Sequence, residues 1–259
     1  MARYLVTGAT GFLGGHLVEA LRAHGHDVVA LARGLAAVDL GEGVTVRRGD
    51  VLERDSVADA AAGADGIFHC AGLVSRKRDD AELLRRVHVE GTRNVVAAAR
   101  AAGVRVSFDP NVRLHLWDDV APLRRLCADV LPSCDVAKVA LDEAELCTGE
   151  GDPERAAARL AEMGVALACI TLAEEGALVR RGADVLRVPA ERVEVVDTTG
   201  AGDAFVAGLL SVVARAGPIA SLSRADLERA VRFANRVAAR VVTRVGAVAG
   251  LPRAGEISV

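Results

Sequence analysis

The chain has 259 residues, of which 51% are hydrophobic and 26% are charged, and its formal net charge is −3. This is enough apolar material for a large α/β domain, and the charge gives no electrostatic reason to expect a nucleic-acid partner. No apolar run reaches the roughly 18 residues of a membrane span, and the N-terminus shows no signal-peptide pattern, so we expect a cytoplasmic protein without a membrane partner. Five cysteines without Cys-x-x-Cys spacing indicate buried thiols.

Apolar runs and helical patterns alternate through the first hundred residues. We expect strands at residues 3–6, 26–32, 44–48 and 66–72, and helices up to about residue 21, at 55–62 and at 81–102. This alternation is typical of βαβ units and predicts a parallel sheet.

The first expected strand runs into a glycine-rich turn, Thr7-Gly-Ala-Thr-Gly-Phe-Leu-Gly14, before a helix. In such a turn Gly8 permits the sharp bend, Gly11 lets the backbone approach a pyrophosphate, and Gly14 lets the helix pack on the strand. The glycines alone are a weak signal, but the strand before them and the helix after them fit a dinucleotide site.

These residues resemble the N-terminal half of an extended short-chain dehydrogenase/reductase of the NAD(P)-dependent epimerase kind. Arg33, at the end of the second strand, suits the 2′-phosphate of NADP, but it is equally well read as a solvated strand-end arginine. The family's catalytic Tyr-x-x-x-Lys pair is missing, because the only tyrosine is Tyr4 and Gly8 follows it by four residues. The resemblance implies these cofactor contacts: Gly8, Thr10, Gly11, Phe12, Leu13, Gly14, Arg33, Asp50, Val51, Cys70, Ala71 and Gly72.

The remaining residues continue the pattern. A fifth strand from Val104 leads into Asp-Pro-Asn-x-Arg, and further strands are expected at 134–139 and 167–172. A hairpin is expected at 177–181 and 185–189, and helices are expected from 142, at 153–163, at 204–214 and at 224–242.

The most informative stretch is Asp197-Thr-Thr-Gly-Ala-Gly-Asp-Ala-Phe205, which lies between a β-rich segment and an apolar helix. The unpaired N–H groups of a helix N-terminus form an anion site, and Gly200 and Gly202 allow a ligand to come close. A carboxylate there, Asp203, has the chemistry of a general base beside a transferring phosphoryl group. The alternative is an ordinary acidic residue in a first helical turn.

The stretch resembles the signature of the ribokinase/fructokinase (PfkB) carbohydrate kinases. The resemblance implies Asp203 as catalytic base and the N–H groups of Gly200, Ala201 and Gly202 as the anion hole. The family's Asn-x-x-Glu element has Ala140 in place of asparagine here, and its Thr-x-Gly-x-x-Gly segment has Ala173 in place of glycine. The other implied positions are Thr171, Ala173, Gly176, Asn235 and Gly246 for ATP, Arg113 for substrate, Glu143 for Mg²⁺ through phosphate or water, and Asp197 and Thr199 for a monovalent cation.

The two resemblances meet within one strand, and no flexible linker separates them. We therefore expect a single fused α/β domain over residues 1–259, with a Rossmann-like half at 1–104 and a ribokinase-like half at 105–259. The expected fold is a three-layer α/β/α doubly wound sheet, mostly parallel, with strand order 3-2-1-4-5-6-7 and an antiparallel edge.

This reading predicts a chimeric nucleotide-binding protein that takes NADP or NAD in its first half and ATP with Mg²⁺, and K⁺, in its second. Catalysis is expected to be weak or absent, because the reductase pair and the kinase sugar pocket and lid are missing. Two alternatives stay open: an active PfkB-type kinase acting on a sugar or sugar acid with Asp203 as base, and an engineered chain without ligand function. The oligomeric state is open.

Overall fold

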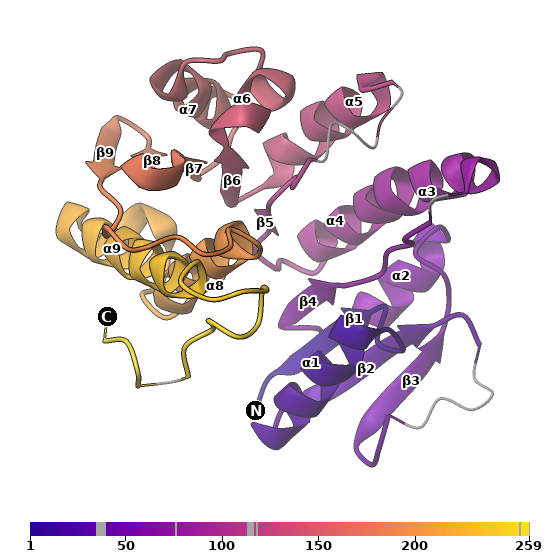
Figure 1. Cartoon of the computed structure of the whole chain (residues 1–259). Coiled ribbons are helices and arrows are strands. Elements are labelled where there is room, and N and C mark those ends of the chain that lie inside the picture. The colour runs from indigo at the N-terminus through magenta and orange to yellow at the C-terminus, as the bar shows by residue number, and fades with distance from the viewer. Residues whose placement is uncertain (35–39, 76, 113–116, 118, 254, 259) are drawn as a thin grey trace. The chain divides into compact units, whose positions relative to one another are not determined.

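The computed structural model describes residues 1–34, 40–75, 77–112, 117, 119–253 and 255–258 (Figure 1). The chain forms two compact units, which are described separately. The first comprises Met1–Val106 and Asp119–Ser133, and the second comprises Ser107–Asp118 and Cys134–Val259. Arg113, for which a substrate contact is expected, lies outside the described residues.

The first unit is built on a four-stranded parallel sheet in the order β3-β2-β1-β4. Its strands are β1 (Arg3–Thr7), β2 (Asp27–Ala32), β3 (Val44–Arg48) and β4 (Gly66–His69). Its helices are α1 (Phe12–Ala23), α2 (Arg54–Ala61), α3 (Ala81–Arg85), α4 (Thr92–Ala101) and α5 (Ala121–Val130), and a π-helical segment, Arg86–Gly91, joins α3 to α4. The expected long helix from Ala81 is therefore present, whereas α5 was not predicted.

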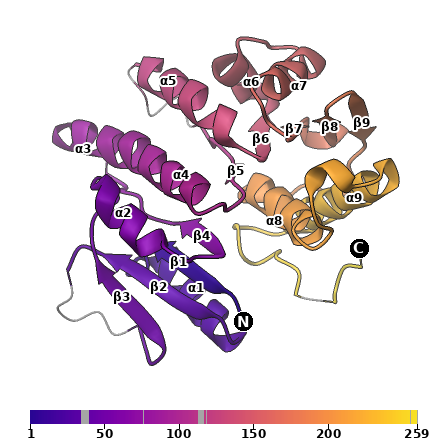
Figure 2. The same ribbon diagram turned by 180° about the vertical axis from the view of Figure 1, so that it is seen from behind.

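Two apolar clusters hold helices on opposite faces of this sheet. On one face Val6 and Val28 pack with Val18 of α1. On the other face Leu5 and further strand residues pack with residues of α2, such as Val57, and of α4. Both clusters follow from strand geometry, because successive residues of β1 point to opposite faces. The unit has three layers, which Figure 2 shows from behind.

The second unit is built on a five-stranded mixed sheet in the order β5-β6-β7-β8-β9. Its strands are β5 (Ser107–Phe108), β6 (Val136–Ala140), β7 (Leu167–Thr171), β8 (Ala177–Arg181) and β9 (Asp184–Val188). Its helices are α6 (Leu141–Thr148), α7 (Pro153–Glu162), α8 (Ala201–Val213) and α9 (Arg224–Val241). Strands β5, β6 and β7 are parallel, and β8 and β9 form the predicted antiparallel hairpin.

The expected single continuous sheet was wrong, because the described strands form two sheets. The expected fifth strand from Val104 is only two residues long, Ser107–Phe108, and it pairs with β6 alone. Pro110, two residues after β5, has no N–H to donate and therefore cannot extend the strand pairing.

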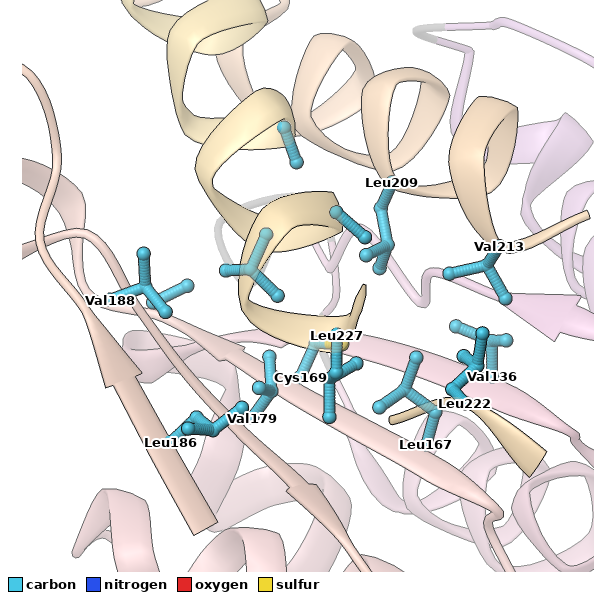
Figure 3. Packing of buried hydrophobic residues seen from close by; sticks show 14 of the residues in the cluster. Val136, Leu167, Cys169, Val179, Leu186, Val188, Leu209, Val213, Leu222 and Leu227 are labelled. Atoms are coloured by element: carbon cyan, nitrogen blue, oxygen red, sulfur yellow. The ribbon is translucent and has the colours of Figure 1, made fainter. Parts of the chain in front are cut away.

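The core of the second unit lies between its sheet and the helices α8 and α9 (Figure 3). Val136 of β6 and Leu167 of β7 contribute from the sheet, and Leu209 of α8 and Leu227 of α9 contribute from the helices. Because side chains alternate along a strand, Lys138 lies on the same face of β6 as Val136, toward these helices.

Two composition-based expectations concern the chain as a whole. All five cysteines are thiols, and four of them are buried. Within the described ranges, no helix combines the length and the apolar character needed to cross a bilayer.

Candidate active site

The candidate site begins at the N-terminus of α8, where Gly200 has a left-handed backbone with φ of 82°. A Cβ at Gly200 would lie 2.9 Å from that of Ala247, so this position needs glycine for its conformation and for its close approach. The Ala201 N–H, expected in the anion hole, instead donates to the Thr198 carbonyl at 3.1 Å. Among the described residues, the N–H groups of Gly202 and Asp203 have no acceptor.

The Asp203 side chain is exposed at this same turn. Its charge is one of the causes that raise the pKa of the half-buried Asp109 carboxyl, after burial itself. The two carboxylates are therefore close enough to repel each other. This places an accessible carboxylate beside two unpaired backbone donors at the positive end of a 13-residue helix.

An ion pair between a buried lysine and a half-buried aspartate lies behind this turn and was missed from the sequence. The Lys138 Nζ donates to both Asp109 oxygens, at 3.3 Å and 3.2 Å. Lys138 is only 5% exposed. The signal was a lone lysine inside an apolar strand, where buried charges occur almost only as pairs.

Glu143 is buried where β6 runs into α6. It accepts hydrogen bonds from the N–H groups of Ala140, at 3.1 Å, and Val112. Burial raises the pKa of its carboxyl, and these bonds oppose the rise. Glu143 therefore fixes the start of α6 and the loop after β5. The expected role toward Mg²⁺ stays a prediction.

The segment expected to contact nucleotide, Thr171 to Gly176, leaves the carboxyl end of β7 through a short turn. Ala173 has φ of 51°, a left-handed conformation that glycine adopts more easily. Gly176 has φ of 95°, and any Cβ there would overlap the Val188 carbonyl. The substitution of alanine for glycine at 173 therefore falls on a strained position.

Asp197 and Thr199, expected near a monovalent cation, lie in a loop that is held by hydrogen bonds to the Asp197 carboxylate. The Asp197 carboxylate accepts from the Thr199 N–H at 2.9 Å, the Thr199 hydroxyl at 2.6 Å and the Gly246 N–H at 2.7 Å. These bonds lower the pKa of Asp197.

Asn235, expected near adenine, is buried in α9. Its side-chain amide donates to the carbonyls of Val188 and Pro189, both at 3.0 Å, and so joins α9 to the end of β9.

In the first unit, the glycine-rich turn after β1 is explained by packing of the chain on itself. A Cβ at Gly8, where φ is 68°, would lie 2.6 Å from the Ala71 nitrogen, and one at Gly14 would overlap the Gly8 carbonyl. The Gly11 N–H donates to the Gly8 carbonyl at 2.9 Å. Gly8 and Gly14 are therefore required whether or not a dinucleotide binds.

The other residues expected to contact a dinucleotide differ in burial and in their contacts within the chain. The Asp50 carboxylate accepts from the Leu52 N–H at 3.0 Å and shapes the entry to α2. Val51 belongs to the core. Cys70 and Ala71 are half-buried, and the exposed contacts are Thr10, Phe12, Leu13, Arg33 and Gly72.

The part of the chain that the structure describes holds no group of three or more His, Cys, Asp or Glu placed around a metal. Mg²⁺ in phosphoryl-transfer sites is bound by one or two carboxylates together with substrate phosphates. The donor set here, with Asp203 exposed beside unpaired amides, fits Mg²⁺ that arrives with a nucleotide.

Two family models match the chain. That of the pfkB family carbohydrate kinases matches residues 78–254, which is more than half of the chain. That of the NAD dependent epimerase/dehydratase family matches residues 4–108, which is less than half.

Curated relatives are kinases. An aminoimidazole riboside kinase from Salmonella typhimurium is 36% identical over 185 residues, covering 71% of this chain and 54% of its own length. A fructokinase from Escherichia coli is 37% identical over 163 residues, covering 62% and 52%. The chain therefore spans about half the length of the curated relatives it matches.

Solved kinase structures resemble nearly the whole chain. Aminoimidazole riboside kinase from Salmonella enterica, complexed with aminoimidazole riboside and an ATP analog, has a TM-score of 0.63 at 26% identity and covers 96% of this chain and 80% of its own. A putative ribokinase II from E. coli with ATP and Mg²⁺ has a TM-score of 0.64 at 22% identity, with coverages of 98% and 79%. A Vibrio cholerae fructokinase variant with fructose, ADP and potassium has a TM-score of 0.61 at 22% identity, with coverages of 97% and 96%.

These matches overturn the predicted chimera of a reductase half and a kinase half. Single kinase chains cover 96–98% of this chain, including its first hundred residues. The epimerase resemblance is partial, and NADP or NAD as cofactor is not supported. The physical reason lies in the glycines, since Gly8 and Gly14 satisfy contacts within the chain and do not require a pyrophosphate. The chain belongs to the pfkB family of carbohydrate kinases.

Proposed function

We propose that the chain transfers the terminal phosphoryl group of ATP to a hydroxyl of a small sugar or sugar acid. The observation that carries the proposal is the exposed Asp203 carboxylate beside the unpaired N–H groups of Gly202 and Asp203 at the start of α8. In this role Asp203 takes the proton of the attacking hydroxyl, and the two N–H groups hold the oxygens of the transferring group.

The nucleotide is proposed to lie along the carboxyl edge of the parallel strands. Strands β6 and β7 both end at this edge, where ligands of open α/β sheets bind, and Thr171 to Gly176 follow β7 there. Mg²⁺, when bound with the phosphates, would neutralise their charge beside Asp203. K⁺ would belong at the loop of Asp197 and Thr199, which the bond to Gly246 holds in place.

The acceptor is proposed from the kinases that this chain resembles. Their names indicate fructose, aminoimidazole riboside and 2-dehydro-3-deoxygluconate, all small polyhydroxylated molecules.

The proposal is tested by measuring ADP formation from Mg-ATP with each of these three acceptors. We expect Asp203→Asn to lower kcat by about 10²- to 10⁴-fold, the usual contribution of a general base. Its melting temperature should stay close to that of the wild type, because the side chain is exposed.

The matched control is Asp55→Asn, which removes an exposed first-turn carboxylate from α2 instead. It should leave turnover unchanged. A wild-type chain that phosphorylates none of the acceptors, or an Asp203→Asn variant with full turnover, would contradict the proposed function.

A further inference from the structure

Lys138 occupies an unusual place for a lysine. It is the central residue of β6, is 5% exposed, and lies on the sheet face that packs against α8 and α9. A charge so deep in the fold is costly to desolvate, and a buried ion pair often stabilises a protein no better than apolar residues of the same volume. Stability alone therefore does not explain why lysine is present here.

Asp109 holds the Lys138 ammonium group through both carboxylate oxygens, at 3.2 Å and 3.3 Å. The Asp109 side chain is only 16% exposed. It also accepts a hydrogen bond from the Asn111 N–H at 3.2 Å, which ties it to the loop after β5. The ammonium group is therefore fixed in position by a carboxylate that is itself fixed.

The pinned ammonium group lies directly against the first turn of α8. A Cβ placed on Gly202 would be 3.0 Å from the Lys138 Nζ and 3.7 Å from its Cε. The end of an ordinary lysine side chain would move aside for such a methyl group. Here movement would break the two hydrogen bonds to Asp109, so the pair sets how closely the turn approaches the sheet.

We propose that the Asp109–Lys138 pair positions the first turn of α8, and with it the N–H groups of Gly202 and Asp203, for phosphoryl transfer. Lys138 and Asp109 act here as positioning residues, through the turn. This inference rests on the proposed function of that turn. It also explains why the second glycine of the Gly-Ala-Gly stretch, Gly202, lacks a side chain: the Lys138 ammonium group occupies the space that a Cβ would need.

The first test separates positioning from stability. Lys138→Met leaves the half-buried Asp109 without its partner, whereas the double variant Asp109→Asn/Lys138→Met removes both charges and should fold with a melting temperature nearer that of the wild type. We expect both variants to lose about 10²-fold in kcat, with KM for ATP changed by less than about threefold, because misplacement of the reacting groups costs rate. A double variant that melts like the wild type and keeps its kcat would overturn the proposal.

The second test needs no turnover. In ¹⁵N-labelled protein, the double variant should shift the backbone amide resonances of Gly202 and Asp203. Arg159→Met, which breaks the exposed Arg159–Glu162 pair on α7, should leave both resonances in place. Unshifted amides in the double variant would overturn the positioning role even if the wild type proves inactive. Absence of turnover in the wild type, by contrast, would count against the proposed function alone.

The third test uses Gly202→Ala, whose added methyl group should displace the Lys138 ammonium group. We expect this variant to lose about 10²-fold in kcat. In the Lys138→Met background the same substitution should cost far less, because the pinned group is gone. Equal losses in both backgrounds would show that Gly202 and Lys138 are independent, and would overturn the proposal.

Discussion

Single residues decide how well the candidate nucleotide loop is built. Ala173 adopts φ of 51°, in a loop whose end at Gly176 also has positive φ. The left-handed conformation costs an L-residue about 1–2 kcal/mol, which is partly offset by the greater entropy of glycine in the unfolded chain.

We therefore predict that Ala173→Gly raises the free energy of unfolding by about 0.5 kcal/mol, or roughly 1–2 °C in melting temperature. Because the loop belongs to the proposed ATP site, the Kd for ATP should also fall. Calorimetry measures both quantities. Ala183→Gly, in the hairpin turn where φ is not positive, is the control and should lower stability. A lower melting temperature for Ala173→Gly would contradict the backbone strain inferred at Ala173.

Some residues of the candidate site were predicted from the sequence, and others were not. Asp203 and the glycines before it stand in a local pattern of strand, turn and helix, which the sequence displays directly. Lys138 and Asp109 are 29 positions apart, and only the pairing of β5 with β6 brings them together. A lone charge in an apolar strand indicates that a partner exists, but this signal was not used, and it does not identify the partner.

Elements of the first unit meet around the half-buried imidazole of His69. The Thr7 Oγ1 lies 2.8 Å from the His69 Nδ1 and accepts from the Ala71 N–H at 3.2 Å. The His69 Nε2 lies 3.3 Å from the Thr92 Oγ1, whose hydroxyl donates to the His88 carbonyl at 2.6 Å. These bonds form a consistent chain when His69 is neutral and carries its proton on Nε2, so β1, β4 and α4 share one network.

Burial, with a smaller contribution from the charge of His88, lowers the pKa of His69 to about 4, from an ordinary value near 6.5. The unfolded chain therefore binds a proton more readily than the folded chain does. The stability from neutral His69 is complete above pH 6.5 and is lost as the pH falls toward 4, by up to about 3 kcal/mol.

We predict that His69→Gln destabilises the fold at pH 7 but removes this part of the acid sensitivity. Urea unfolding at pH 7 and pH 4.5 measures the effect as a difference between variant and wild type. His16→Gln, at an exposed position of α1, should follow the wild type at both pH values. A His69→Gln deficit that is equal at pH 7 and pH 4.5 would contradict the lowered pKa.

At the same scale, helix α5 shows a pattern that was present in the sequence but not used. Leu123, Leu126, Cys127 and Val130 follow the spacing i, i+3, i+4, i+7 and are all buried. The expected strand–helix order elsewhere was close to the observed elements, because alternation and helix periodicity are local. The division into two sheets was not predictable in this way, since it depends on which strands pair.

Each of the two units is built from two separate segments of the chain. The chain passes between the units at residues 106–107, 118–119 and 133–134, and α5 belongs to the first unit although it follows β5 of the second. The expected single domain over residues 1–259 remains our proposal, and one cooperative unfolding transition is its consequence.

Two core variants test this cooperativity. Leu126→Ala in α5 of the first unit and Leu209→Ala in α8 of the second each open a cavity, at a cost of about 2–5 kcal/mol. In differential scanning calorimetry, each should lower the midpoint of the same single transition. Two separable transitions, each moved by only one of the variants, would show that the units unfold independently.

The burial of Lys138 also determines how the chain meets a protease that cleaves after lysine. The sequence contains only two lysines, and Lys77 is exposed whereas Lys138 is 5% exposed within β6. Cleavage after Lys77 therefore needs no unfolding of the second unit, whereas cleavage after Lys138 requires β6 to leave its sheet. The second cut would proceed at a rate set by the population of that opened state, so limited digestion reads the stability of the sheet beneath α8 directly.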